Sequence, residues 1–339
     1  MNNDKILFIY TGGTIGSWPT PQGYVPKHGF DALIDQQLGD AAHEALGNYD
    51  LVELDELLDS SNIQPNDWTR LAEMVVRRYE DYSGFVILHG TDTMAYSASA
   101  LSFMLRGLTK PVILTGAQIP LSQPRTDAVR NLLDAVHYAR HSALHEVAIC
   151  FGGRLIRGNR ATKAHTSALQ AFDSPNFPLL SEAGIQPLPV SSNLPEQPLR
   201  FMLPSKPSRV AQLALYPGII DEQIDAVLNN PDIAAVVLQT FGAGNPPDRN
   251  QHLMNRLAEA NQRGVIVVNS TLCHGGPVVQ GTYATGARLK ALNVISGQDM
   301  TLEAAFCKLH YLLGRNLPTQ EVRELMGQSL AGEVTLAED

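Results

Sequence analysis

The chain has 339 residues, about twice the usual length of one domain, so we expect two domains. Hydrophobic residues make up 44% and charged residues 17% of the sequence, which excludes a disordered chain, a collagen and a coiled coil. The formal net charge is −9 and no basic stripe appears, which argues against a nucleic-acid partner. Because the longest apolar run is far shorter than a membrane span, and residues 6–10 are too few for a signal-peptide core, we expect no membrane association and a cytoplasmic location.

In the first half of the chain, short apolar runs alternate with amphipathic runs. Strands are predicted at 5–10, 84–88, 112–115 and 147–151, and helices at 66–82, 93–105 and 127–140. Strands that alternate with helices of this length indicate βαβ units around a largely parallel sheet.

Residues 174–208 interrupt this alternation, because eight of the chain's 21 prolines fall within them. Proline lacks a backbone donor and fixes φ, so the segment is predicted to be an extended connector. Beyond it the alternation resumes, with strands expected at 210–215, 234–238, 265–269 and 293–296 and helices at 221–228, 248–262 and 301–313. We therefore predict two α/β domains with largely parallel sheets: an N-terminal domain over 1–190, a proline-rich linker over 191–209 and a C-terminal domain over 210–339.

The three cysteines, Cys150, Cys273 and Cys307, are widely spaced and form no CxxC pair. Cys307 and His310 lie three residues apart, but no second ligand pair accompanies them, so no metal site is predicted. We interpret all three cysteines as small buried side chains in a reducing compartment.

The first predicted strand runs directly into the sequence TGGTIG at residues 11–16. Glycines let the backbone turn sharply at the carboxyl end of a strand, where open α/β sheets bind ligands. The segment lacks the glycine spacing of a dinucleotide site or a P-loop, and what remains is Thr14, a hydroxyl between glycines. The proline- and glycine-containing stretch 17–29 that follows is a candidate lid, with Tyr24 at its middle.

Two further polar segments follow predicted strands. The sequence HGTDT at 89–93 places Thr91 and Asp92 before a helix, where both residues are alternatively helix caps. RATKAH at 160–165 supplies Lys163, and a lysine beside a hydroxyl, held by a carboxylate, is one recognised base for a threonine nucleophile. No GxSxG elbow and no HExxH motif occurs in the chain.

Together these segments resemble the bacterial L-asparaginase family, and specifically its cytoplasmic type I branch. TGGTIG at 11–16 and the strand followed by HGTDT at 85–93 are similar to the two signatures of that family. HGTDTMAY at 89–96 and the short N-terminus resemble the type I branch. The similarity extends from Ile6 to about Glu333 and includes the proline-rich segment and the sequence YATG at 283–286.

The resemblance implies a hydrolase that converts L-asparagine to L-aspartate and ammonia through an acyl-threonine, without metal or cofactor. The implied catalytic residues are Thr14 as nucleophile with Tyr24 beside it, and a polar triad of Thr91, Asp92 and Lys163. Asp59, Ser60 and Ser61, together with Thr91 and Asp92, would bind the substrate's α-carboxylate and α-amino groups. In physical terms, a zwitterion needs a donor for its carboxylate and an acceptor for its ammonium, and backbone donors near 90–92 would stabilise the oxyanion.

The family also implies a pocket completed by a neighbouring subunit, hence a homodimer or a dimer of dimers, and Asn245 is our candidate for the borrowed group. Type I enzymes can carry an effector asparagine site, implied here around Thr162, Thr271 and Cys273. An arginine typical of that site falls where Gln239 stands. A guanidinium binds a carboxylate through two hydrogen bonds and a glutamine does not, so we expect weakened effector control.

Two other functions stay open. The asparaginase-like subunit of a tRNA-dependent amidotransferase carries an extra N-terminal domain, whereas this chain starts on its first strand. A catalytically inactive amino-acid sensor would be expected to lose Thr14 or Lys163, and both are present. The sequence does not decide between asparagine and glutamine as substrate.

Overall fold

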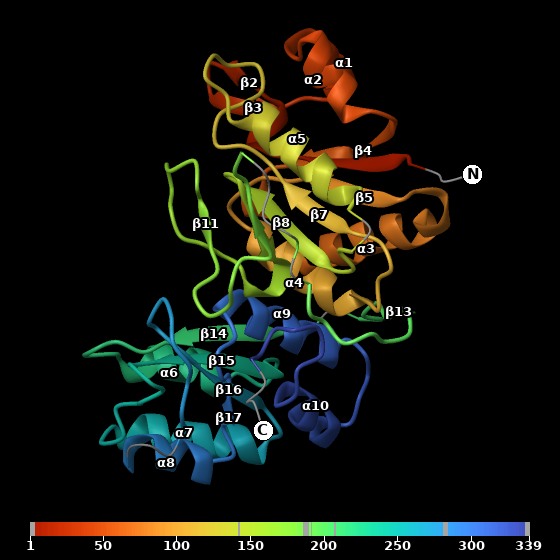
Figure 1. Cartoon of the computed structure of the whole chain (residues 1–339). Coiled ribbons are helices and arrows are strands. Elements are labelled where there is room, and N and C mark those ends of the chain that lie inside the picture. Colours follow the sequence, from red (N-terminus) through yellow and green to blue (C-terminus); the bar gives the residue numbers. More distant parts are fainter. Residues whose placement is uncertain are drawn as a thin grey trace. The chain divides into compact units, whose positions relative to one another are not determined.

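The computed structural model describes residues 4–141, 143–185, 190, 192–206, 208–280 and 284–335. The chain forms two compact units (Figure 1), one of Met1–Ser174 with Pro178–Met202 and one of Pro175–Phe177 with Leu203–Asp339. Tyr283, part of the YATG sequence, lies outside the described residues. Among the described helices, none is both long and apolar enough to cross a membrane.

The first unit is built on a seven-stranded sheet with the order β12-β9-β8-β7-β5-β1-β4. Its strands are β1 (Ile6–Gly12), β4 (Tyr49–Leu58), β5 (Gly84–Leu88), β7 (Val112–Thr115), β8 (Val147–Phe151), β9 (Arg154–Arg157) and β12 (Ser181–Glu182). The five strands from β4 to β8 are mutually parallel, while β9 and β12 each run antiparallel to their neighbour. The prediction of a largely parallel sheet is confirmed.

Helices cover both faces of this sheet. They are α1 (Phe30–Gln37), α2 (Asp40–Leu46), α3 (Pro65–Arg77), α4 (Met94–Met104) and α5 (Ala128–Ala139). Helix α3 packs against α4, and α2 packs against α5. Helix α3 begins at Pro65, with the Asp67 carboxylate accepting from the Gln64 N–H at 2.8 Å, and it ends at Arg77 rather than at the predicted residue 82. A short 3₁₀ turn, Tyr79–Asp81, follows it and accounts for the difference.

Several short strands form small two-stranded sheets around the main one. Strands β2 (Ser17–Thr20) and β3 (Gly23–Pro26) form an antiparallel hairpin within the stretch 17–29, and its role as a lid stays a prediction. Strand β6 (Leu105–Arg106) pairs with β13 (Arg200–Phe201), and β10 (Thr162–Lys163) pairs with β11 (Phe172–Asp173). Because β12 and β13 lie in the proline-rich segment, parts of that segment pair with the first unit, and the linker boundaries at 191–209 stay a prediction.

The second unit contains a four-stranded parallel sheet with the order β14-β15-β16-β17. Its strands are β14 (Val210–Ala214), β15 (Ala235–Thr240), β16 (Ile266–Thr271) and β17 (Ile295–Ser296), and its helices are α6 (Asp221–Leu228), α7 (Gln251–Gln262), α8 (Ala284–Ala291), α9 (Leu302–Leu313) and α10 (Thr319–Met326). One hydrophobic cluster joins α6 and α7 to the sheet, including Ile224, Val236, Leu253 and Leu257. Helix α9 packs on β14, β15 and β16. The second predicted α/β domain is therefore confirmed.

Candidate active site

The site lies where the strand order of the first sheet changes direction. The first strand along the chain, β1, is flanked by the second and third parallel strands, β4 and β5. Open α/β sheets bind ligands outside the carboxyl ends of the strands at such a switch point. Three loops leave the sheet there: the one that begins with Gly13 and Thr14 after β1, the segment from Asp59 after β4, and HGTDT after β5.

Glycines allow these three loops to touch. A Cβ on Gly13, whose φ is +78°, would lie 2.4 Å from the Gly90 backbone nitrogen. A Cβ on Gly90 would lie 2.5 Å from the Ser60 Oγ, and one on Gly12 would lie 2.4 Å from the Leu58 carbonyl oxygen. Contacts this short leave no room for a side chain, so the close approach of the loops requires glycine at these positions.

Thr14 begins a one-turn 3₁₀ helix, Thr14–Gly16, directly after the TGG turn. Its side chain is half-buried, and its hydroxyl has no hydrogen-bond partner among the residues that the structure describes. The turn itself is held by other groups, since the Ser17 hydroxyl donates to the Gly13 carbonyl at 2.9 Å. The hydroxyl of Thr14 is thus positioned by the backbone and is available to a reacting group.

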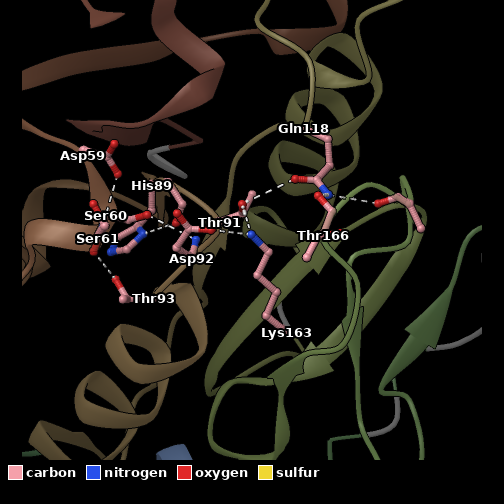
Figure 2. Close-up of polar contacts among 12 residues, drawn as sticks. Asp59, Ser60, Ser61, His89, Thr91, Asp92, Thr93, Gln118, Lys163 and Thr166 are labelled. Carbon is pink, nitrogen blue, oxygen red and sulfur yellow. Dashed lines mark hydrogen bonds and ion pairs between the residues drawn. The ribbon is translucent and has the colours of Figure 1, made fainter. Parts of the chain in front are cut away.

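Lys163 joins the HGTDT loop to a strand more than 70 residues away in sequence (Figure 2). Its Nζ donates to the Thr91 Oγ1 at 2.8 Å and forms an ion pair with Asp92 Oδ1 at 2.5 Å. Thr91 is 6% exposed, and the Lys163 side chain is 19% exposed, whereas the Asp92 side chain is 59% exposed. A shielded hydroxyl therefore contacts a lysine that is held from the solvent side by a carboxylate.

The alternative interpretation of Thr91 and Asp92 as helix caps is wrong. The N-cap of α4 is Thr93, which makes no side-chain capping bond and instead donates through its hydroxyl to the Ser60 carbonyl at 2.7 Å. Because both Thr91 and Asp92 are engaged by Lys163, their side chains are directed toward the site.

The predicted substrate-binding segment is a second 3₁₀ turn, Ser60–Asn62, that follows β4. Asp59 is exposed, and one of its carboxylate oxygens accepts from the Ser61 N–H at 3.1 Å. Ser60 is 2% exposed, and its Oγ accepts from the Asp92 N–H at 3.2 Å. Figure 2 shows Asp59, Ser60 and Ser61 on the side of Asp92 away from Lys163. Ser60 therefore has two acidic neighbours: Asp59, the residue before it, and Asp92, whose N–H donates to the Ser60 Oγ.

Tyr24 lies on the hairpin that starts directly after the Thr14 turn. Its strand β3 pairs with β2, with Tyr24 opposite Pro19, and the Tyr24 side chain is 54% exposed. The hairpin returns to the turn where the Lys27 N–H donates to the Gly16 carbonyl at 3.3 Å. Both ends of the hairpin are therefore anchored beside the turn, while Tyr24 lies on the exposed part.

Sequence reasoning missed Gln118, which follows strand β7 at the same edge of the sheet. Its Oε1 accepts from the Thr91 hydroxyl at 3.4 Å, and its Nε2 donates to the carbonyls of Thr166 and Ala168 at 3.1 Å each (Figure 2). The Asp127 carboxylate accepts from the Gln118 backbone N–H. Its place at a strand's carboxyl end was the available signal, but a lone glutamine forms no recognisable motif.

The remaining predicted residues lie in or near the second sheet. Gln239 is on β15, and Thr271 ends β16, where its hydroxyl donates to the Gly242 carbonyl at 2.6 Å and accepts from the Cys273 N–H at 3.0 Å. Cys273 is exposed, so the prediction that all three cysteines are buried is wrong for this one, which lies in a loop beyond the strand end. Thr162 is on β10 in the first unit, and Asn245 closes a turn with Phe241 in the second.

Two family models cover most of the chain: "Asparaginase, N-terminal" over residues 5–193 and "Glutaminase/Asparaginase C-terminal domain" over residues 209–326. The chain is 44% identical to L-asparaginase 1 of Escherichia coli (strain K12), over 99% of each chain. It is similar to the crystal structure of L-asparaginase I from Vibrio cholerae, with a TM-score of 0.88, 43% identity and coverage of 98% and 100%. It is also similar to the thermostable L-asparaginase of Thermococcus kodakarensis, with a TM-score of 0.86, 34% identity and the same coverage. The chain belongs to the asparaginase family.

Proposed function

We propose that this protein hydrolyses L-asparagine to L-aspartate and ammonia. Family membership over the whole chain supports the reaction class, and the relatives with high coverage are named L-asparaginases. The observation that carries the proposal is the close approach of two threonine-bearing loops at the switch point, where the backbones of Gly13 and Gly90 pack together. One loop carries Thr14, with an available hydroxyl, and the other carries Thr91, which is bonded to a lysine–carboxylate pair. An amide is a poor electrophile, and this arrangement supplies a nucleophile together with groups that move a proton.

In the proposed reaction, the Thr14 Oγ1 attacks the side-chain amide carbon of the substrate. The carbon–nitrogen bond breaks, the hydroxyl proton passes to the departing nitrogen, and ammonia leaves an acyl-threonine. Water then attacks the ester, and L-aspartate leaves with Thr14 restored. Tyr24 lies on the hairpin beside this turn, and the Thr91–Lys163 pair is the proposed route for the proton. In its ammonium form, Lys163 donates to Thr91 and Asp92 and thereby orients Thr91. Only the neutral amine form of Lys163 can accept a proton.

The loops that meet at the switch point carry charged and polar groups that suit the α-ammonium and the α-carboxylate of asparagine. We propose that the carboxylates of Asp59 and Asp92 accept from the α-ammonium, and that Ser60 and Ser61 donate to the α-carboxylate. Asn245, from a neighbouring subunit of a homodimer or a dimer of dimers, would complete the pocket. We propose a cytoplasmic location as well, on the resemblance to the type I branch.

The effector residues form a second, separate proposal. Gln239, Thr271 and Cys273 gather at the carboxyl ends of β15 and β16, where Gln239 takes the place of the arginine expected from type I enzymes. The neutral amide of Gln239 cannot form an ion pair with the carboxylate of asparagine, so we propose that asparagine binds weakly at any such site.

The experiment is the release of ammonia and aspartate from L-asparagine and, separately, from L-glutamine by the purified chain. We expect turnover of asparagine, and loss of several powers of ten in kcat in the variant Thr14→Ala with an unchanged unfolding midpoint. Serine in place of Thr14 is the matched control, since it keeps the hydroxyl. Binding of asparagine without ammonia release would favour the sensor, and an active Thr14→Ala beside an inactive Thr91→Ala would reverse the roles of the two threonines.

A further inference from the structure

His89 follows strand β5 and is a fully buried polar residue next to the site (Figure 2). Its Nδ1 lies 2.6 Å from the carbonyl oxygen of Gly90, the next residue. Its Nε2 lies 2.8 Å from the Oγ of Ser97, a buried residue in the first turns of α4. Its backbone N–H donates to the Thr115 carbonyl at 2.8 Å, which continues the pairing of β5 with β7. The ring is therefore held on one side by the backbone carbonyl of the next residue and on the other by a side chain of helix α4.

These contacts determine which ring nitrogen carries the proton. A carbonyl oxygen only accepts, so Nδ1 must be the protonated nitrogen that donates to Gly90. The Ser97 hydroxyl then donates to Nε2. Burial lowers the pKa of His89 to about 4, so the ring is neutral near pH 7 and holds this single tautomer.

The bond from His89 to Gly90 fixes the direction of the next backbone donor. In a planar trans peptide the C=O and the following N–H point in opposite directions. Because the Gly90 carbonyl faces the buried ring, the Thr91 N–H points away from it. Among the described residues this N–H has no hydrogen-bond partner, whereas the next one, of Asp92, donates to the Ser60 Oγ.

The Gly90 backbone lies against the loop that carries the proposed nucleophile. The backbone of Gly13, the residue before Thr14, packs against the backbone of Gly90 so closely that a Cβ would not fit between them. A backbone donor at Thr91 is thus available to a group that the Thr14 hydroxyl attacks. Such a donor stabilises charge only where charge develops, so it acts on the transition state more than on substrate binding.

We propose that His89 is a positioning residue of the asparaginase reaction: through Nδ1 it fixes the Gly90–Thr91 peptide so that the Thr91 N–H donates to the developing oxyanion. The proposal rests on the proposed function, because it assigns the oxyanion to the substrate amide that Thr14 attacks. The ring then has two separate roles. Nδ1 positions the Gly90–Thr91 peptide, and Nε2, through Ser97, links the end of β5 to α4.

Two substitutions separate these roles. In His89→Asn the side-chain nitrogen can take the place of Nδ1 and keep the bond to Gly90, whereas in His89→Gln it can take the place of Nε2 and keep the bond to Ser97. We expect His89→Gln to lose about 10²-fold in kcat, as for removal of one oxyanion donor, with KM little changed. We expect His89→Asn to retain most of kcat. Ser97→Ala is the matched control, since it removes only the link to α4, and its kcat should stay near that of the unmodified chain.

The proposal is overturned if the Asn and Gln variants lose kcat equally, if the loss in His89→Gln falls on KM, or if Ser97→Ala is as slow as His89→Gln. Where a His89 variant does not fold, nitrogen-15 NMR of the unmodified protein at neutral pH decides: a proton on Nδ1 supports the proposal and one on Nε2 overturns it. If the unmodified protein releases no ammonia, the proposed function fails, and the ring's tautomer still reports separately on the contact with Gly90.

Discussion

Replacing Lys163 by methionine removes an ammonium that bonds to both Thr91 and Asp92 while keeping most of the side chain's apolar stem. A hydrogen bond from a charged group contributes about 1.5–3 kcal/mol, which corresponds to roughly 10- to 100-fold in kcat if Lys163 only orients Thr91. If Lys163 also transfers a proton, a further factor of about 10²–10⁴ is lost. Because Asp92 is 59% exposed, the ion pair itself contributes at most about 1 kcal/mol to the free energy of unfolding. We therefore expect a large loss of kcat in a protein of nearly unchanged stability.

The assay is kcat for ammonia release from neutral to alkaline pH, with the unfolding midpoint measured on the same samples. The matched control is Lys163→Arg, which keeps a positive donor but does not give up its proton at these pH values. We expect Lys163→Met to stay slow at every pH, because orientation and proton transfer are lost together. Recovery of Lys163→Met by raising the pH alone would refute the positioning role, and an Arg variant as slow as the Met variant would assign most of the effect to proton transfer.

Three further changes test other parts of the molecule. Gly13→Ala should lower kcat at least tenfold and cost about 1–3 kcal/mol of stability, because φ +78° with ψ 179° is a backbone conformation essentially restricted to glycine and because the added Cβ would collide with the Gly90 backbone. Unaltered kinetics and unfolding would contradict this. Lys308→Met should destabilise the second unit by about 3–5 kcal/mol in urea unfolding, because it leaves the fully buried Glu333, 2.7 Å from Lys308, without its counter-charge. Adding Glu333→Leu should restore part of the lost stability. An unchanged free energy of unfolding in Lys308→Met would contradict a stabilising role for the ion pair. Asparagine saturation should be hyperbolic, because Gln239 weakens an effector site by about 10- to 100-fold relative to arginine; a Hill coefficient above about 1.5 in the unmodified chain would show that another group supplies the charge.

The switch point explains why chemistry gathers in one place although its residues are far apart in sequence. Thr14 follows the first parallel strand, Ser60 the second and Thr91 the third, and these strands are neighbours in the order β4-β1-β5. Parallel strands present their carboxyl ends at one edge, so loops after each of them converge. Lys163 comes from β10, a short strand outside this sheet, and contacts Thr91 and Asp92 on the side away from Ser60 (Figure 2).

The sequence by itself determined the buried strands, most of the helices and the two glycine-containing motifs. Strands β5, β7 and β8 have the predicted bounds, because a parallel strand covered on both faces is a continuous apolar run that charged residues do not interrupt. Strand β4 was missed because its sequence, YDLVELDELL, lies at the edge of the sheet and carries four acidic residues that interrupt the apolar run. The motifs were recognisable because a turn that packs backbone against backbone admits only glycine.

Only the tertiary structure decided how these motifs act on each other. The bond from Lys163 to Thr91, the bond from Thr91 to Gln118 and the contact of Ser60 with Gly90 each join residues that are 27 or more positions apart, and no local pattern encodes such a pairing. His89 illustrates the difference most directly. Its sequence position places it in a motif, but its tautomer, its neutral charge and its hold on the Gly90 carbonyl follow from complete burial between β5 and α4, which arises only when the strand and the helix pack together.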